Sequence, residues 1–270
     1  MRKNPVRMNH LTNQTTSGLP VMSETLGTVA ARRVGRETKD NNCESDLLER
    51  GQADETCSDS LFERFAWLYI LCREKLFQDD TKRMIQALWP NEKPVAGTRI
   101  VEFGCGPGFY SCHLGALFPQ VSVLGIDSSE SQLTCAREKA ETRHLENCMF
   151  ECLNVMELPC DDSAFDALIA SRLFTVLPKR ERAIAEMFRV LRPGGRCFVA
   201  EPRQAFRASL PLFSMWLLAS LTRFKNGYRE PAKATVLSSE KFARLFHTQP
   251  WREINTWQDG RYQYALCEKN

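Results

Sequence analysis

The sequence predicts an α/β fold, because short apolar strand patterns alternate with helix patterns from residue 99 to the end of the chain. This alternation is typical of a mostly parallel sheet with helices on both faces. The 270 residues are 43% hydrophobic and 26% charged, close to the average for globular proteins. The composition excludes a disordered, collagen-like or polytopic membrane protein and leaves enough apolar side chains for a full core.

Seven strands are predicted in this region. They are Arg99–Phe103, Val121–Ile126, Met149–Leu153, Ala164–Ala170, Arg196–Ala200, Arg252–Trp257 and Tyr262–Glu268. A turn at Asp259-Gly260 separates the last two strands, and this spacing favours a hairpin. We therefore expect a seven-stranded sheet with an antiparallel C-terminal hairpin.

The predicted helices precede the first strand and lie between the strands. They are Leu61–Cys72, Thr81–Trp89, Tyr110–Phe118, Glu130–Thr142, Arg180–Leu191, an apolar stretch at Leu210–Leu221, and Ser239–Phe246. A capping box of Ser129 and Gln132 would start the helix at Glu130. Pro193-Gly194-Gly195 would separate the helix that begins at Arg180 from the fifth strand.

The first 58 residues lack a sustained apolar period and are rich in small polar and charged residues, so we expect a disordered tail and acidic linker over residues 1–58. Residues 1–40 carry seven Lys/Arg and three Asp/Glu, whereas residues 41–59 carry one Arg and six acids. The net charge of +3 therefore combines unlike segments and gives no support to nucleic-acid binding. A single domain is expected over residues 59–270.

The eleven cysteines are scattered, and their spacing matches no zinc-binding pattern. We therefore predict no metal centre. Disulfide frameworks are typical of short secreted chains, so reduced thiols in a cytoplasmic protein are the expected state.

A glycine-rich loop follows the first predicted strand. It reads Gly104-Cys105-Gly106-Pro107-Gly108, and glycines let the backbone approach a ligand closely. A dinucleotide fingerprint would need a glycine at Phe109, and a phosphate-binding P-loop would end in Gly-Lys-Ser/Thr, which Phe109-Tyr110 excludes. The loop stands where open α/β sheets bind ligands.

Asp127 ends the second predicted strand, nineteen residues after Gly108. A carboxylate at this position can accept hydrogen bonds from both ribose hydroxyls of a nucleoside. The alternative is that Asp127 only caps the next helix, a role that Ser128 or Ser129 could fill. The loop and the acid together favour a nucleoside-binding site.

Four motifs at ordered spacing carry a family resemblance: VEFGCGPG (101–108), GID (125–127), NVMELPCDDSAFD (154–166) and RVLRPGGRCFVAEP (189–202). They resemble the class I S-adenosylmethionine-dependent methyltransferases, especially the UbiE-like (methyltransferase type 11) branch of quinone methyltransferases. The resemblance covers the chain from Arg99 to Pro202, includes the final hairpin in outline, and leaves out the first 58 residues. It implies a Rossmann-like fold and S-adenosyl-L-methionine as cofactor.

The resemblance also implies roles for individual residues. Glu102 would hold the methionine amino end through the loop, and Asp127 would bind the ribose. The expected cofactor-binding residues are Glu102, Gly104, Cys105, Gly106, Gly108, Asp127, Ser128, Asn154, Val155 and Ser171. Asn154 and Val155 would lie beside the adenine, and Ser171-Arg172 would lie where the acceptor approaches. Many relatives have His or Asn soon after this point, whereas this chain has Leu173-Phe174-Thr175.

Methyl transfer from a sulfonium requires mainly that donor and acceptor be aligned and that water be excluded. A general base is needed only when the acceptor still carries its proton. The candidates are Glu201, His113, Tyr110 and Glu157. His113 could equally be a packed or solvated histidine, and Glu201 could form a cap or a salt bridge.

Two segments, 61–77 and 203–230, could form lids over the site. Leu210–Leu221 is nearly uninterrupted apolar sequence, too short for the roughly 20 residues of a membrane-spanning helix. Flanking arginines and lysines are typical of a helix at a membrane surface, and a buried helix on the sheet is the alternative.

The apolar lids favour a small hydrophobic or aromatic acceptor, such as a quinone, isoprenoid, pigment or lipid, with a peripheral membrane contact through residues 210–224. Other interpretations are a protein methyltransferase or a non-catalytic subunit that binds S-adenosylmethionine.

Overall fold

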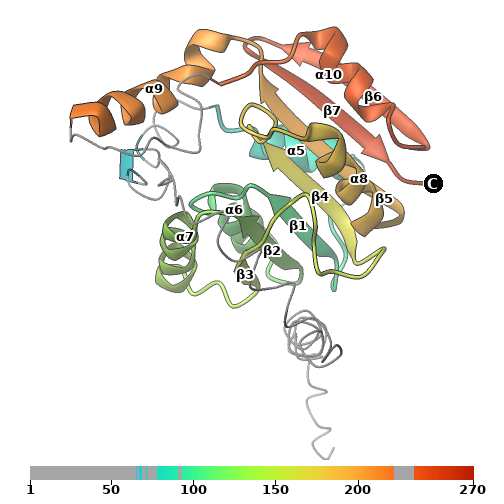
Figure 1. Cartoon of the computed structure of the whole chain (residues 1–270). Helices are drawn as coiled ribbons and strands as arrows, with labels where there is room; N and C mark the ends of the chain where they lie inside the picture. The colour runs from blue at the N-terminus through green and yellow to red at the C-terminus, as the bar shows by residue number, and fades with distance from the viewer. Residues whose placement is uncertain (1–64, 66, 69–70, 72–77, 91–92, 222–233) are drawn as a thin grey trace, which may run out of the picture. The chain divides into compact units, whose positions relative to one another are not determined.

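The computed structural model describes residues 65, 67–68, 71, 78–90, 93–221 and 234–270 (Figure 1). All of them fall within one compact unit, Asp40–Asn270. The predicted tail and acidic linker over 1–58, and most of the predicted lid over 61–77, lie outside the described residues. The domain boundary at residue 59 stays a prediction.

A seven-stranded sheet with the order β3-β2-β1-β4-β5-β7-β6 forms the centre of the fold. Its strands are β1 Arg99–Phe103, β2 Ser122–Asp127, β3 Cys148–Cys152, β4 Phe165–Ser171, β5 Leu191–Pro202, β6 Glu253–Asp259 and β7 Tyr262–Glu268. β7 runs antiparallel to both β5 and β6, and the other neighbouring pairs are parallel. The structure confirms the predicted sheet and its antiparallel C-terminal hairpin.

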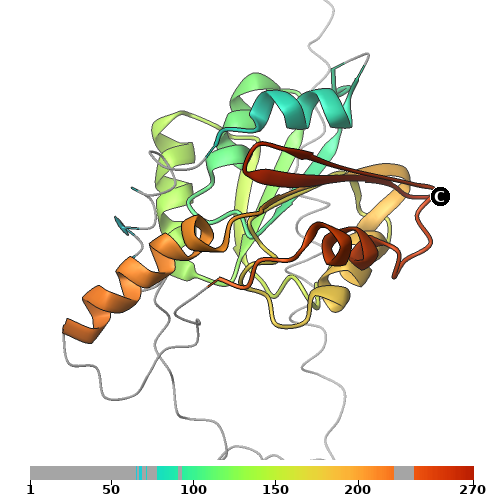
Figure 2. The ribbon, with the colours of Figure 1, turned by 90° about the horizontal axis from the view of Figure 1, so that it is seen from above.

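Helices cover both faces of this sheet, as predicted (Figure 2). The helices are α5 Thr81–Leu88, α6 Phe109–Leu117, α7 Glu130–Thr142, α8 Arg180–Val190, α9 Ala205–Leu221 and α10 Ser239–Phe246. α5, α6 and α7 lie on one face, and α8 and α10 lie together on the other. α9 follows β5 and extends away from the sheet in both views.

One hydrophobic core lies between the sheet and the pair α5 and α6. Met84 of α5 and Leu114 of α6 are fully buried against Ile100, Ile169 and Phe198 of the central strands. A smaller cluster fixes α7 on β3, with Leu133, Ala136 and Phe150 among its members. Central strands covered on both faces have nearly continuous apolar sequences, which is why sequence pattern located them well.

The fifth strand starts earlier than predicted, because Pro193-Gly194-Gly195 lies inside β5 and does not precede it. Gly194 has a φ of 74°, and its N–H donates to the carbonyl of Lys269 at 3.0 Å. The register with β4 shifts between Phe165 and Ala167. The three residues thus form an irregularity that still pairs through the backbone.

The chain reverses its direction of strand addition between β1 and β4. From β1 the sheet grows towards β2 and β3, and from β4 it grows towards β5. A Cβ on Gly104, just after β1, would lie 2.9 Å from Leu173 Cδ1, just after β4. The two loops therefore meet at the switch point where open α/β sheets place their ligands.

No helix among the described residues is both long enough and apolar enough to span a membrane. The cytoplasmic location stays a prediction of the sequence.

Candidate functional site

The glycine loop after β1 follows a path that requires left-handed backbone at three positions. Gly104, Gly106 and Gly108 have φ values of 69°, 52° and 69°, which other L-residues adopt at a cost of about 1–2 kcal/mol each. The N–H groups of Gly104 and Cys105 both donate to the carbonyl of Ile126, at 2.8 and 2.9 Å. The loop is therefore held against the end of β2.

Gly108 brings α6 and α7 into close approach. It is the N-cap residue of α6, and a Cβ there would lie 2.8 Å from Ala136 Cβ and 3.0 Å from Phe150 Cε1. Cys105 is also packed tightly, since a Cβ on Gly125 would lie 2.9 Å from its Sγ. Burial raises the pKa of the Cys105 thiol well above its usual range, so this side chain is a neutral packing group.

Glu102 ties β1 to the first turn of α6. Its carboxyl group is almost fully buried, and Oε2 accepts hydrogen bonds from the N–H of Ser111 at 2.8 Å and from Ser111 Oγ at 2.6 Å. Glu102 thus fixes the helix that the glycine loop leads into, and its role at the methionine end of the cofactor stays a prediction.

Asp127 joins the glycine loop to the turn that starts α7. Its Oδ2 accepts the N–H of Gly106 at 2.8 Å, and its Oδ1 accepts the N–H of Ser129 at 3.0 Å. Ser129 Oγ itself caps α7 by accepting the N–H of Gln132 at 3.4 Å, and Ser128 lies exposed between the two residues. Asp127 therefore organises both loops, while the cap of α7 is supplied by Ser129.

The turn after β3 lies beside Asp127. The N–H of Leu153 donates to the carbonyl of Asp127 at 3.1 Å, and Asn154 Oδ1 accepts the N–H of Met156 at 3.0 Å. Val155 is buried. The structure thus brings the predicted adenine-side residues next to the predicted ribose-side acid.

Gln132 was missed as a candidate site residue. Its side chain is 1% exposed, and neither amide atom has a hydrogen-bond partner among the described residues. It lies one turn before Ala136, so both side chains lie on the face of α7 that meets the glycine loop. The sequence assigned Gln132 to a capping box, but only its backbone N–H takes part. Buried polar groups without partners are rare, so this amide is a candidate ligand contact.

Three of the proposed bases are engaged elsewhere. Tyr110 is buried, and its hydroxyl contacts the backbone of the segment before α5, accepting the N–H of Asp80 at 3.3 Å. The ring of His113 lies edge-on to Phe109, with centroids 4.6 Å apart. Glu157 forms an exposed ion pair with Arg182 at 2.8 Å. None of these contacts involves the glycine loop.

Glu201, near the end of β5, supports the loop after β4. Its Oε1 accepts the N–H of Phe174 at 2.8 Å, and its side chain is buried. Burial raises the pKa of Glu201 to about 7, against the lowering effect of the Phe174 N–H and the positive charges of Arg172 and Arg180. The carboxyl group holds the loop that the acceptor would approach.

Arg172 follows Ser171 at the end of β4 and has a φ of 60°. Its N–H donates to the carbonyl of Ala200 at 2.8 Å, and its guanidinium donates to the hydroxyl of Tyr262 at 2.8 Å. Left-handed backbone at a non-glycine residue persists only where the surroundings hold it, and such residues cluster at functional sites. Arg172 thus connects β4, β5 and β7 at the place where the acceptor is predicted to approach.

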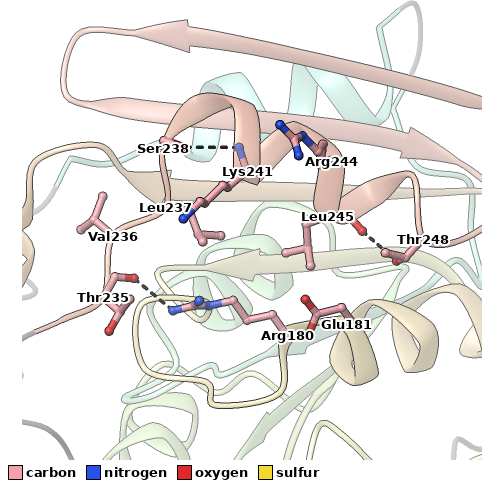
Figure 3. Close-up of a pocket in the computed structure, with 10 residues that line it drawn as sticks. All are labelled: Arg180, Glu181, Thr235, Val236, Leu237, Ser238, Lys241, Arg244, Leu245 and Thr248. Carbon is pink, nitrogen blue, oxygen red and sulfur yellow. Dashed lines mark hydrogen bonds between the residues drawn. The ribbon is translucent and has the colours of Figure 1, made fainter.

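A separate cavity of about 620 Å³ lies between α8, α10 and the segment before α10 (Figure 3). Leu237, Lys241 and Leu245 line one side, and Arg180 and Glu181 line the other. Arg180 donates to the carbonyls of Phe174 and Thr235, at 2.6 and 3.2 Å. The cavity therefore adjoins the loop that Glu201 holds, but no residue of the glycine loop lines it.

Residues 100–195 match the family described as "Methyltransferase domain". A trans-aconitate 2-methyltransferase of Deinococcus radiodurans is 34% identical over 60% of each chain. A demethylmenaquinone methyltransferase of Thermus thermophilus is 37% identical over 41% of this chain and 52% of that protein.

Among solved structures, a phosphoethanolamine N-methyltransferase 2 of Haemonchus contortus, in complex with S-adenosyl-L-methionine, has a TM-score of 0.58 at 12% identity, covering 83% of this chain and 59% of that one. The [4+2]-cyclase SpnF has a TM-score of 0.53 at 19% identity, covering 70% and 79%. These two likenesses concern the fold alone.

Residues 100–195 form a methyltransferase domain, and the seven-stranded sheet has the Rossmann-like fold of the class I S-adenosylmethionine-dependent methyltransferases. UbiE-like proteins are among the relatives of the chain. Its cofactor is S-adenosyl-L-methionine. The matches span 60% and 52% of the length of the two curated relatives named above. The described residues fit the cofactor, since a side chain at Gly104 or Gly108 would meet neighbouring atoms within 2.9 Å and Gln132 offers a buried amide on the helix that packs against Gly108.

Replacing Gly108 by alanine should lower the free energy of unfolding by about 2–5 kcal/mol, because strained backbone and overpacking both act there. Urea denaturation measures this change. Gly97→Ala is the matched control, because Gly97 has a φ of 82° but nothing within 4 Å of a Cβ. It should lose only the backbone part, about 1–2 kcal/mol. Equal losses in the two variants would contradict the close packing of α6 on α7.

The raised pKa of Glu201 predicts a pH dependence of stability. The folded state binds the proton more tightly than the unfolded state, so this stabilising effect is complete below pH 4.5 and is lost as the pH rises to about 7. The loss is roughly 3 kcal/mol. Glu201→Gln keeps an acceptor for the Phe174 N–H and should lack this dependence. Denaturation of both proteins between pH 4 and 8 tests it, and parallel curves would contradict the assignment.

Proposed function

We propose that this protein transfers the methyl group of S-adenosyl-L-methionine to a small hydrophobic or aromatic acceptor by in-line displacement. The observation that carries the proposal is an apolar cluster between the two predicted lid segments. Phe65 and Leu68 of the first lid pack against Met215, Leu218 and Ala219 of α9. Both α9 and the glycine loop follow strands at the carboxyl edge of the sheet, where the acceptor would enter.

A second apolar contact supports the same acceptor chemistry. Leu212 of α9 packs with Val176, Ala234 and Val236. Val176 belongs to the loop after β4, the loop that Glu201 holds through Phe174. The acceptor end of the crevice is therefore bordered by apolar side chains, which favour an apolar ligand through burial of its surface.

The bound cofactor supplies an electrophilic methyl group on a sulfonium that is already a good leaving group. The residues of this chain would then act mainly by positioning. Gly104, Gly106 and Gly108 would admit the methionyl part, Asp127 would accept hydrogen bonds from the ribose, and the lids would exclude water. Holding two reactants in line can supply several kcal/mol, up to about 7–11 kcal/mol for ideal alignment.

We infer that Glu201 acts as a positioning residue. Its Oε1 is committed to the Phe174 N–H, and the loop it holds borders the acceptor end. The names of the two curated relatives point to different acceptors, trans-aconitate and demethylmenaquinone. Support for an apolar acceptor therefore comes from the lids of this chain.

A methyl-transfer assay with radiolabelled cofactor tests the proposal directly. The acceptors are a phenol, a quinol with a short prenyl chain, a tricarboxylate and a lysine peptide. We expect label on the phenol or quinol and none on the tricarboxylate or peptide. Transfer only to the tricarboxylate or the peptide would refute the apolar acceptor, and cofactor binding without any transfer would favour a non-catalytic subunit.

Asp127→Ala should weaken cofactor binding by roughly 10- to 150-fold, the scale of hydrogen bonds to a charged group.

Gln132→Met tests the proposed contact of the buried amide. Removing an amide with no partner should leave the stability of the ligand-free protein equal or higher, by up to about 3 kcal/mol. Cofactor affinity, measured by calorimetry, should fall roughly tenfold through loss of a hydrogen bond. Thr134→Val, on the exposed side of α7, is the control and should leave affinity unchanged. An unaltered affinity in Gln132→Met would show that Gln132 does not contact the cofactor.

A further inference from the structure

The helix α9 presents large apolar side chains to solvent. Leu210, Phe213, Trp216, Leu217 and Leu221 are between 40% and 73% exposed. Trp67 and Leu71 of the neighbouring lid are 59% and 46% exposed. We call the five exposed residues of α9 the apolar face. A face of this kind on a monomer marks an interaction site.

The apolar face is separate from the side of α9 that packs on the protein. Met215 and Ala219 are fully buried in the cluster with Phe65, whereas Phe213 and Leu217 lie on the exposed side, four residues apart. Both sides of the helix are thus apolar, and only one has a protein partner among the described residues. Figure 2 shows α9 extending away from the sheet, so the sheet does not cover its exposed side. The sequence left two alternatives for this helix, one at a membrane surface and one buried on the sheet. In the structure α9 is packed on one side and exposed on the other, so neither alternative describes it fully.

We propose that the apolar face inserts into the interfacial region of a bilayer that contains anionic lipids. The face includes Trp216, and tryptophan side chains favour the boundary between headgroups and acyl chains. The sequence around it is cationic, since residues 203–233 contain six Arg/Lys and one Glu, a formal charge of +5. Apolar insertion together with attraction to anionic headgroups is the mode of interfacial helices.

This inference deepens the proposed function, because an apolar acceptor of low solubility would be reached at a lipid surface. The buried side of α9 contacts Val176 in the loop after β4 through Leu212. The same helix would thus contact the bilayer on one side and border the acceptor site on the other.

Co-sedimentation of the full chain with vesicles tests the inference, without cofactor or acceptor present. The vesicles are phosphatidylcholine alone or mixed with phosphatidylglycerol. We expect binding to the mixed vesicles and at least tenfold weaker binding to phosphatidylcholine alone. The triple variant Phe213→Gln, Trp216→Gln, Leu217→Gln should bind the mixed vesicles at least tenfold more weakly than wild type, with unchanged cofactor affinity as the check of folding.

Leu117→Gln is the matched control, since Leu117 of α6 is 55% exposed but lies outside the apolar face; it should bind like wild type. The inference is overturned if the wild type does not bind the mixed vesicles, or if the triple variant binds them as strongly as the wild type does. The face would be assigned to a second copy of the chain by a different pair of results. These are a wild type that is a dimer in sedimentation velocity and does not bind vesicles, and a triple variant that is a monomer. Co-sedimentation measures no turnover, so its outcome is independent of the methyl-transfer assay. If the protein binds vesicles but the assay detects no methyl transfer, the proposed function is refuted and this inference stands.

Discussion

The carboxylate of Asp127 holds together the two loops on which the cofactor side of the site depends. One oxygen accepts the N–H of Gly106 and the other accepts the N–H of Ser129. The first contact fixes the middle of the glycine loop, and the second fixes the start of α7, whose Ala136 touches Gly108. An ionised acid can serve several donors at once, so one side chain sets the distance between two helices and two strands.

Buried acids fill the same role at two further strands. Glu102 of β1 holds Ser111 of α6, and Glu201 of β5 holds Phe174 after β4. In each case the carboxylate accepts a backbone N–H at the carboxyl edge of the sheet or close to it. Loops at this edge are shaped by side chains of the strands below them, which gives irregular backbone a rigid support.

Sequence pattern located the strands and most helices because buried parallel strands and amphipathic helices leave strong periodic signals. β1, α7, α10 and β7 have the predicted bounds, and the other described elements differ mainly at their ends. The Pro-Gly-Gly segment was misplaced because the pairing of Gly194 with Lys269 depends on a strand 75 residues away. The side-chain direction of Gln132, the loop contact of Glu201 and the left-handed backbone of Arg172 likewise follow from tertiary neighbours, which periodicity does not encode.

The predicted cofactor side and the predicted acceptor side of the site differ in the sequence separation of the residues that connect them. On the cofactor side, Gly106 and Asp127 are separated by 21 residues, whereas on the acceptor side Arg172 meets Tyr262 across 90 residues. Closing a longer loop carries a larger entropy cost and slows folding. The contact on the predicted nucleoside side therefore needs only local chain closure, whereas the contact on the predicted acceptor side needs the C-terminal hairpin to pair with β5.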